Sequence, residues 1–243
     1  MKAMILAAGR GERMKPLTDT CPKPMLTVHG KPLIEYHIER LVAAGITEIV
    51  INHAWLGQQI EAYLGDGSRW HANIRYSAEK NGALETAGGI ANALPLLGQE
   101  AFWLVNGDVF SSFDFKVRPK LDREQQAHLF MVNNPGHHPG GDFAITQGML
   151  DNLSENKAQR QSYTYSGIAI FKPAFFQQPC FSPQTGGSGQ DDGTVMPLGP
   201  LLREGAKQQK ITASILPGSW TDVGTPERLA ELNKDTQSVP SRV

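Results

Sequence analysis

Cysteine is scarce in this chain: Cys21 and Cys180 are the only two among 243 residues. A disulfide framework needs several pairs, so a small disulfide-stapled scaffold is excluded, and the scarcity fits a reducing compartment. No apolar run approaches the ~20 residues that a helix needs to cross a bilayer. The apolar run at residues 1–8 is also too short for a signal peptide. We therefore expect a cytoplasmic protein with no membrane partner.

An excess of positive charge is also missing, since 23 Lys and Arg face 24 Asp and Glu. Without a broad cationic surface we expect no nucleic-acid partner. No repeat or clear linker divides the chain, and no exposed apolar stripe stands out. We expect a monomer with a single domain over residues 1–243. It comprises a first half at 1–126, a second half at 127–236 and a frayed tail at 237–243.

Two common glycine-rich motifs are missing from the N-terminal loop. The apolar residues 3–7 lead directly into Ala-Gly-Arg-Gly-Glu-Arg-Met at 8–14. A P-loop needs Gly-Lys followed by Ser or Thr, which this loop lacks. A dinucleotide-binding fingerprint needs a third glycine where the chain has Met14.

Glycines and fixed cations remain in this loop. Gly9 and Gly11 permit positive φ and close backbone approach, so main-chain N–H groups can face an anion. Arg13 and Lys23 add permanent positive charge. The combination predicts a phosphate-binding loop. A turn that merely joins a strand to a helix would require neither cation.

Strands and helices alternate along the first half. The apolar patterns predict strands at 3–7, 46–52, 73–77 and 102–106 and helices at 33–42, 56–64 and 85–94. This alternation predicts a Rossmann-like three-layer α/β/α fold with a mostly parallel central sheet. Such sheets bind ligands at the carboxyl ends of their strands, where the 8–14 loop and Asp108 both fall.

The alternation changes in the second half and predicts a small additional β region. Strands are expected at 128–133 and 163–171, a hairpin at 143–146 and 149–153, a helix at 198–207, a strand at 211–216 and a helix at 226–233. The segment 182–194 is rich in Gly, Ser and Asp and is typical of a mobile surface loop.

Three segments near the N-terminus together resemble the signature of the sugar-phosphate nucleotidyltransferases. They are Leu-Ala-Ala-Gly-x-Gly-x-Arg at 6–13, Pro-Leu-Thr at 16–18 and Pro-Lys-Pro at 22–24. The resemblance extends to about residue 233. Enzymes of this family join a sugar 1-phosphate to a nucleoside triphosphate and release pyrophosphate. The resemblance implies that the first half binds the nucleotide and the second half the sugar phosphate.

The resemblance also assigns the nucleotide site. It implies that Arg13 holds the triphosphate and that Lys23 bridges the α-phosphate and the sugar phosphate, as the two catalytic residues. Glu85 and Thr86 would lie near the base and ribose, although Thr86 also suits a helix start. The full nucleotide-binding set expected is Leu6, Ala7, Ala8, Gly9, Gly11, Glu12, Arg13, Lys23, Glu79, Ala83, Glu85, Thr86 and Asn106.

Two aspartates fit the metal ligands of the family. Asp108 and Asp222 match the pair that shares Mg²⁺, and this hard cation is held by one or two carboxylates together with phosphate oxygens. Each aspartate has a structural alternative. Asp108 also suits a turn after a strand, and Asp222 suits a cap for a helix with Pro226 in its first turn.

The sugar phosphate is expected over the second half of the sheet. The resemblance assigns its contacts to Asp108, Gly141, Asp142 and Gly167. A strand bulge is the alternative for Gly167. The pair at 137–138, His-His in a Pro/Gly-rich turn, is more typical of surface polarity than of a zinc site, since no further ligand follows at a suitable spacing.

Four further segments indicate a branch of the family. Residues 51–60, 64–68, 84–89 and 133–138 resemble the branch that makes UDP-N-acetylmuramate from UTP and N-acetylmuramate α-1-phosphate in peptidoglycan recycling. Mannose 1-phosphate with GTP, and glucose 1-phosphate with UTP or dTTP, remain alternatives. So does a nucleotide-sugar-binding regulator without activity.

The acceptor of this branch carries a lactyl carboxylate, which requires a cation or N–H groups nearby. Lys157 and Arg160 are the candidates in the sequence.

Overall fold

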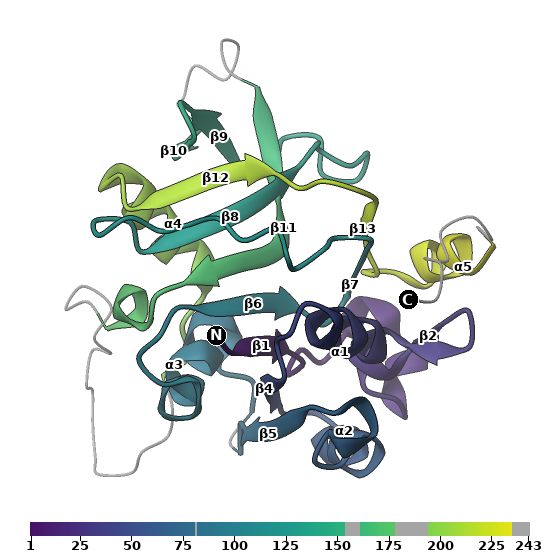
Figure 1. The fold of residues 1–243 in the computed structure, drawn as a ribbon. Helices are drawn as coiled ribbons and strands as arrows, with labels where there is room; N and C mark the ends of the chain where they lie inside the picture. Colours follow the sequence, from purple (N-terminus) through teal and green to yellow (C-terminus); the bar gives the residue numbers. More distant parts are fainter. Residues whose placement is uncertain (81, 154–160, 178–193, 235–243) are drawn as a thin grey trace.

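The computed structural model describes residues 1–80, 82–153, 161–177 and 194–234 (Figure 1). Outside this part of the chain lie Cys180, Lys157, Arg160, all of the 182–194 segment except Thr194, and the 237–243 tail. The predictions made for them stay predictions. No helix among the described residues is long and apolar enough to cross a membrane.

A nine-stranded sheet runs through the molecule (Figure 1). In spatial order its strands are β5 (Asn73–Ala78), β4 (Glu48–His53), β1 (Ala3–Leu6), β6 (Phe102–Asn106), β11 (Ser162–Phe171), β8 (Ala127–Val132), β12 (Ile211–Ile215), β10 (Met149–Asn152) and β9 (Phe143–Thr146). β5, β4, β1 and β6 pair in parallel, and β8 pairs in parallel with β12. β11 runs antiparallel between β6 and β8, so it joins two sets of strands that point the same way.

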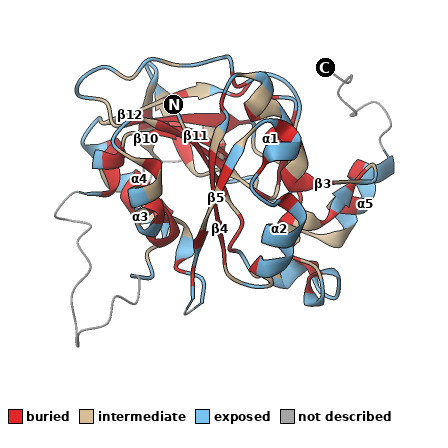
Figure 2. Cartoon of the chain, turned by 60° about the horizontal axis from the view of Figure 1, so that its bottom comes forward, coloured by how far each residue is buried: buried red, intermediate tan, exposed pale blue. Residues whose placement is uncertain are grey.

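Helices cover both faces of this sheet. They are α1 (Leu33–Ala43), α2 (Gly57–Leu64), α3 (Glu85–Leu97) and α4 (Leu198–Lys207). Met4 of β1 packs in one core with α3 and α4, while Ala3 and Ile5 pack in the opposite core with α1 and α2. Because both faces are covered, the central strands are mostly apolar and lie buried in Figure 2. The predicted three-layer α/β/α fold is confirmed.

A third, smaller core holds the N-terminal loop. The loop folds into three short turns, η1 (Glu12–Met14), η2 (Leu17–Asp19) and η3 (Lys23–Met25), followed by the hairpin of β2 (Thr27–Val28) and β3 (Lys31–Pro32). Met14 and Leu26 pack there against Leu229 and Leu232 of α5 (Pro226–Lys234). The last helix therefore fastens the loop that follows the first strand.

Several features differ from the sequence prediction, and the β2–β3 hairpin, which was not predicted, is one of them. The helix expected to end before Pro95 continues to Leu97, because Leu97 is buried in the core and a proline in the last turn removes only one helix bond. The strands β7 (Val109–Ser111) and β13 (Trp220–Asp222) were not predicted, and they pair antiparallel in a separate two-stranded sheet. The other predicted strands and helices are present with small shifts at their ends.

Candidate active site

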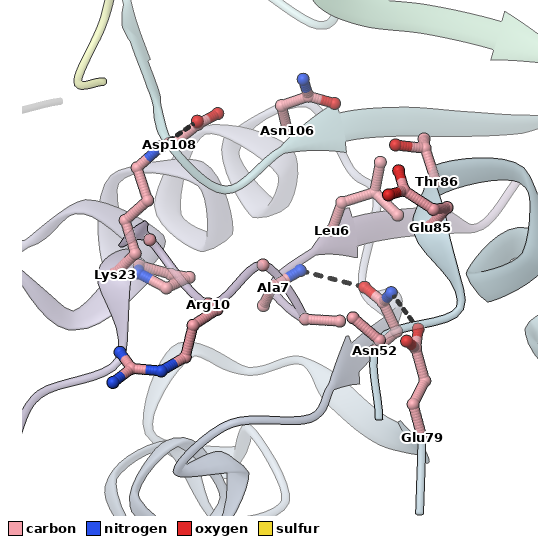
Figure 3. A pocket seen from close by; sticks show the side chains of 15 residues that line it. Leu6, Ala7, Arg10, Lys23, Asn52, Glu79, Glu85, Thr86, Asn106 and Asp108 are labelled. Atoms are coloured by element: carbon pink, nitrogen blue, oxygen red, sulfur yellow. Dashed lines mark hydrogen bonds and ion pairs between the residues drawn. The ribbon is translucent and has the colours of Figure 1, made fainter. Parts of the chain in front are cut away.

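A cleft of about 400 Å³ opens at the carboxyl ends of β1, β4, β5 and β6 (Figure 3). It is lined by Leu6, Ala7, Ala8, Gly9, Arg10, Gly11, Lys23, Pro24, Asn52, Glu79, Ala83, Glu85, Thr86, Asn106 and Asp108. The structure thus brings most of the predicted nucleotide-binding residues together. Lys23 and Asp108 lie at one end of the cleft, and Glu79, Glu85 and Thr86 lie at the other.

The turn after β1 requires glycine. Gly11 has a φ of +70°, and a Cβ added there would lie 2.9 Å from the Thr18 Cγ2 methyl. The Thr18 hydroxyl donates a hydrogen bond of 2.8 Å to the Gly11 carbonyl, so η2 holds the turn in place. A larger residue would both strain the backbone and displace Thr18.

Lys23 and Asp108 form an ion pair across the cleft. The Lys23 side chain is 12% exposed and that of Asp108 is 31% exposed, so the ammonium group is partly withdrawn from water. Lys23 stands at the start of η3, and Asp108 lies in the turn between β6 and β7. That turn position agrees with the structural alternative for Asp108 and does not exclude a ligand role.

Arg10, which the sequence interpretation missed, lines the cleft, whereas Glu12 and Arg13 lie on the exposed turn η1 outside its lining. The Arg10 guanidinium lies 3.9 Å from the centre of the Trp55 ring and donates a 2.7 Å hydrogen bond to the Thr18 carbonyl. These contacts direct its charge toward the loop rather than into the cleft. The signal that could have found Arg10 is its position between the two glycines.

The β7–β13 pairing explains how the two predicted metal ligands come together. Asp222 is paired with Val109, and the Val223 N–H donates a 2.8 Å hydrogen bond to the Asp108 carbonyl. The Asp222 carboxylate contacts Arg228 at 3.1 Å and His137 at 3.1 Å. The capping alternative for Asp222 is wrong, since it lies within β13, ahead of α5.

The two carboxylates supply oxygen donors, the kind of ligand that a hard cation binds. The described residues contain no group of three or more His, Cys, Asp or Glu side chains that could hold a metal ion. Mg²⁺ does not need one, because it retains waters and binds through one or two carboxylates together with substrate phosphates. His137 and His138 contact two different carboxylates, Asp222 and Asp142.

Asp108 lines the cleft, whereas the other three predicted sugar contacts, Gly141, Asp142 and Gly167, lie outside its lining. Asp142 accepts hydrogen bonds from the Tyr165 N–H at 2.8 Å and contacts His138 at 3.0 Å. Gly167 has a φ of +78° at a register shift of β11, so the bulge alternative holds. A Cβ there would lie 2.8 Å from Cγ of Asn106, which lines the cleft.

Gly141, with a φ of +61°, requires the same freedom: a Cβ there would lie 2.6 Å from Oδ1 of Asn134. The two predicted sugar-side glycines therefore both have a structural reason to be glycine.

The end of the cleft with Glu79, Glu85 and Thr86 rests on a buried, hydrogen-bonded pair of side chains. Asn52, at the end of β4, donates a 2.7 Å hydrogen bond to Oε1 of Glu79, and the Leu84 N–H donates one of 2.7 Å to Oε2. Helix α3 begins directly afterwards at Glu85, which confirms the helix-start interpretation for this segment. Beneath the other end, burial lowers the pKa of His37 to about 4, so this imidazole is neutral there.

Comparisons with known proteins agree with this arrangement. A family model described as nucleotidyl transferase matches residues 2–239. The chain is 50% identical over 235 residues to a protein of Neisseria meningitidis serogroup B named N-acetylmuramate alpha-1-phosphate uridylyltransferase, covering 95% of this chain and 96% of that one. A protein of the same name from Caulobacter vibrioides is 30% identical and covers 93% and 92%.

Among solved structures, one assigned as a glucose-1-phosphate thymidylyltransferase of Bacillus anthracis, in complex with sucrose, shares the fold. It superposes with a TM-score of 0.82 at 20% identity, covering all of this chain and 98% of that one.

Proposed function

The chain belongs to the nucleotidyl transferase family, and we propose that it transfers a uridylyl group from UTP to N-acetylmuramate α-1-phosphate. The products would be UDP-N-acetylmuramate and pyrophosphate, made in the cytoplasm during peptidoglycan recycling. The observation that carries this substrate assignment is the 50% identity, over nearly the whole chain, to a protein that bears the name of this activity.

The chemistry suits the groups that line the cleft. An oxygen of the sugar phosphate attacks the α-phosphorus, and the bond from that phosphorus to the pyrophosphate oxygen breaks. The attacking oxygen is already ionised, so no base has to remove a proton from it. The described cleft lining holds no His or Cys and does hold Lys23 and Arg10. The protein's task is charge neutralisation and alignment.

Lys23 has the clearest role in this reaction. Its ammonium group is the less exposed member of the pair with Asp108 and lies at the phosphate end of the cleft. We assign Lys23 to the α-phosphate and the attacking phosphate. Two anionic groups come together there in the transition state, and the ammonium group would stabilise their negative charge. Arg13, on the exposed turn beside the cleft, would hold the outer phosphates. Glu85 and Thr86 would contact the ribose and base.

Asp108 and Asp222 would hold Mg²⁺, since both are carboxylates and the turn that carries Asp108 leads into β7, which pairs with the strand of Asp222. A bound Mg²⁺ would neutralise charge on the phosphate oxygens. Each carboxylate also pairs with a cation of the protein: Lys23 with Asp108, and Arg228 with Asp222. These two cations therefore lie beside the carboxylates, where they would meet the phosphate groups of the substrates.

The sugar would extend from Asp108 toward Gly141, Asp142 and Gly167. A lactyl carboxylate on this side needs cationic or N–H donors. Besides the two candidates outside the described residues, His137 and His138 reach Asp222 and Asp142. Arg228 of α5 contacts His137 and is a fixed cation on this side, which favours an acceptor that carries a second acidic group.

The proposal is tested by mixing the purified protein with Mg²⁺, one nucleoside triphosphate and one sugar 1-phosphate, and following pyrophosphate. UTP with N-acetylmuramate α-1-phosphate should be the preferred pair, ahead of N-acetylglucosamine 1-phosphate, mannose 1-phosphate with GTP, and glucose 1-phosphate with UTP or dTTP. A preference for another pair would overturn the substrate assignment alone. Binding without pyrophosphate release from any pair would identify a regulator instead.

A further inference from the structure

One chain of hydrogen bonds crosses the floor of the cleft and links three strands (Figure 3). The Ala7 N–H donates to Oδ1 of Asn52 at 2.9 Å, and Nδ2 of Asn52 donates to Oε1 of Glu79 at 2.7 Å. The Leu84 N–H completes the chain by donating to Oε2 of Glu79 at 2.7 Å. Its two ends are the turn after β1 and the segment that begins α3.

Both side chains of this bridge are buried and tightly enclosed. Asn52 is 2% exposed and Glu79 is 5% exposed. Gly89 of α3 packs directly against them, since a Cβ there would lie 2.5 Å from Oε1 of Glu79 and 2.8 Å from Nδ2 of Asn52. A buried carboxylate is retained only where donors satisfy it, and here each oxygen has one.

The direction of each bond dictates the residue types. Position 52 must accept from the Ala7 N–H and donate to Glu79, which an amide does. Position 79 must accept twice, from Asn52 and from the Leu84 N–H, which a carboxylate does. If position 52 carried the carboxylate and position 79 the amide, all three hydrogen bonds could still form. Only the bond between the two side chains would change direction, with position 79 as the donor.

We propose that Asn52 and Glu79 are positioning residues that set the distance between the phosphate-binding turn and the base-side segment. This inference rests on the proposed nucleotidyl transfer. Ala7 opens the turn that carries Gly9 and Gly11, and Leu84 immediately precedes Glu85 and Thr86. The α-phosphorus reacts only when both ends of the nucleotide are held at the correct separation, and a misplacement of about 1 Å can reduce the rate by about 100-fold.

The test is an exchange of the two groups. Asn52→Asp sets a carboxylate against Glu79, and Glu79→Gln sets an amide donor against either Asn52 or the Leu84 N–H. Each single variant should lower kcat/KM for the nucleotide by about 10- to 100-fold. The double variant restores three matched bonds at an unchanged net charge, so it should regain most of the loss. KM for the sugar phosphate should change least.

A pH profile adds a readout that loss of packing would not produce. In Asn52→Asp a proton shared between the two carboxylates replaces the missing donor. The activity of this variant relative to wild type should therefore rise as the pH is lowered from 8 to 6. Circular dichroism spectra establish that each variant is folded. If a single variant does not fold, the double variant alone decides, because the exchange predicts that it folds and turns over.

The assay uses whichever nucleotide and sugar 1-phosphate the wild type accepts, so a wrong substrate assignment leaves it intact. If the wild type turns over no pair, the proposed function fails, and nucleotide affinity by calorimetry on the same variants replaces the rate. Single variants that match wild type, or a double variant no better than the product of the singles, would overturn the positioning role.

Discussion

Replacing Gly89 by alanine tests how rigid the floor of the cleft is. An alanine in place of a glycine inside a helix ordinarily stabilises a protein by about 1 kcal/mol. At Gly89 the new Cβ would meet Oε1 of Glu79 at 2.5 Å and Nδ2 of Asn52 at 2.8 Å, distances that side-chain atoms do not tolerate. The two partners cannot retreat without breaking a hydrogen bond to the Ala7 or Leu84 N–H.

The magnitude follows from these opposing effects. Overpacking a buried site costs about 1–3 kcal/mol, and a buried hydrogen bond lost to the displacement costs about 1–3 kcal/mol more. After the helical gain of about 1 kcal/mol, the net loss is about 3 kcal/mol at mid-range. For a chain of this size that corresponds to a fall in Tm of about 6–12 °C.

Urea and thermal unfolding of Gly89→Ala measure this loss. Gly199→Ala is the matched control, because it too lies in a helix and its nearest neighbour would be the flexible end of Arg203 at 3.3 Å. We expect the control to be neutral or slightly stabilised. If Gly89→Ala were as stable as wild type, the side chains of Asn52 and Glu79 could move to make room for the new methyl group. The rigidity inferred from their burial would then be refuted.

Four further predictions concern charge and strain. Lys23→Ala should lower kcat about 100- to 1000-fold, as measured by pyrophosphate release. The control is Lys31→Ala, because the ion pair of Lys31 with Glu39 lies outside the cleft lining. An effect on KM alone would contradict the role assigned to Lys23. Asp108→Asn should abolish Mg²⁺-dependent turnover with an unchanged Tm, and full activity would remove Asp108 from the metal site. Glu85 has a φ of +60°, which strains the backbone of a non-glycine residue. Glu85→Gly should therefore raise the free energy of unfolding by up to about 1 kcal/mol, while loss of the side chain raises KM for the nucleotide. A lower free energy of unfolding would argue against backbone strain at this position. Burial lowers the pKa of His128 from 6.5 to about 4. The free energy of unfolding that the neutral imidazole contributes is therefore fully present above pH 6.5, and about 1–2 kcal/mol of it is lost at pH 5. Urea titrations of wild type should show this loss between about pH 6.5 and 5, and those of His128→Gln should not.

Much of the fold could be predicted because its strands are buried on both faces. Residues 102–106, for example, contain no polar alternation, and Gly107 follows this run directly. The parallel alternation then places the loop after β1 and Asp108 at the same edge of the sheet. That reasoning depends only on local pattern and topology, and both are confirmed.

The remaining features depend on contacts between distant parts of the chain. β7 and β13 are three-residue strands whose pairing joins positions far apart, so neither has a local pattern that predicts a strand. Asn52 looks like any polar residue at a strand end, and only the hydrogen bonds to Ala7 and Glu79 reveal its importance. Arg10 lines the cleft, but the position of its guanidinium is set by Trp55, which is distant in the sequence, and by the Thr18 carbonyl of η2.

The pairing of β7 with β13 has a consequence for the order in which the protein matures. A ribosome that has made residues 1–108 has supplied the residues that line the cleft, yet Asp222 and the α5 side chains that cover Met14 and Leu26 are made only after β11 and α4. Domains generally fold as units. We therefore expect a nascent chain to contain the residues of the nucleotide site well before it can react, and to gain that ability only when β13 and α5 have been made.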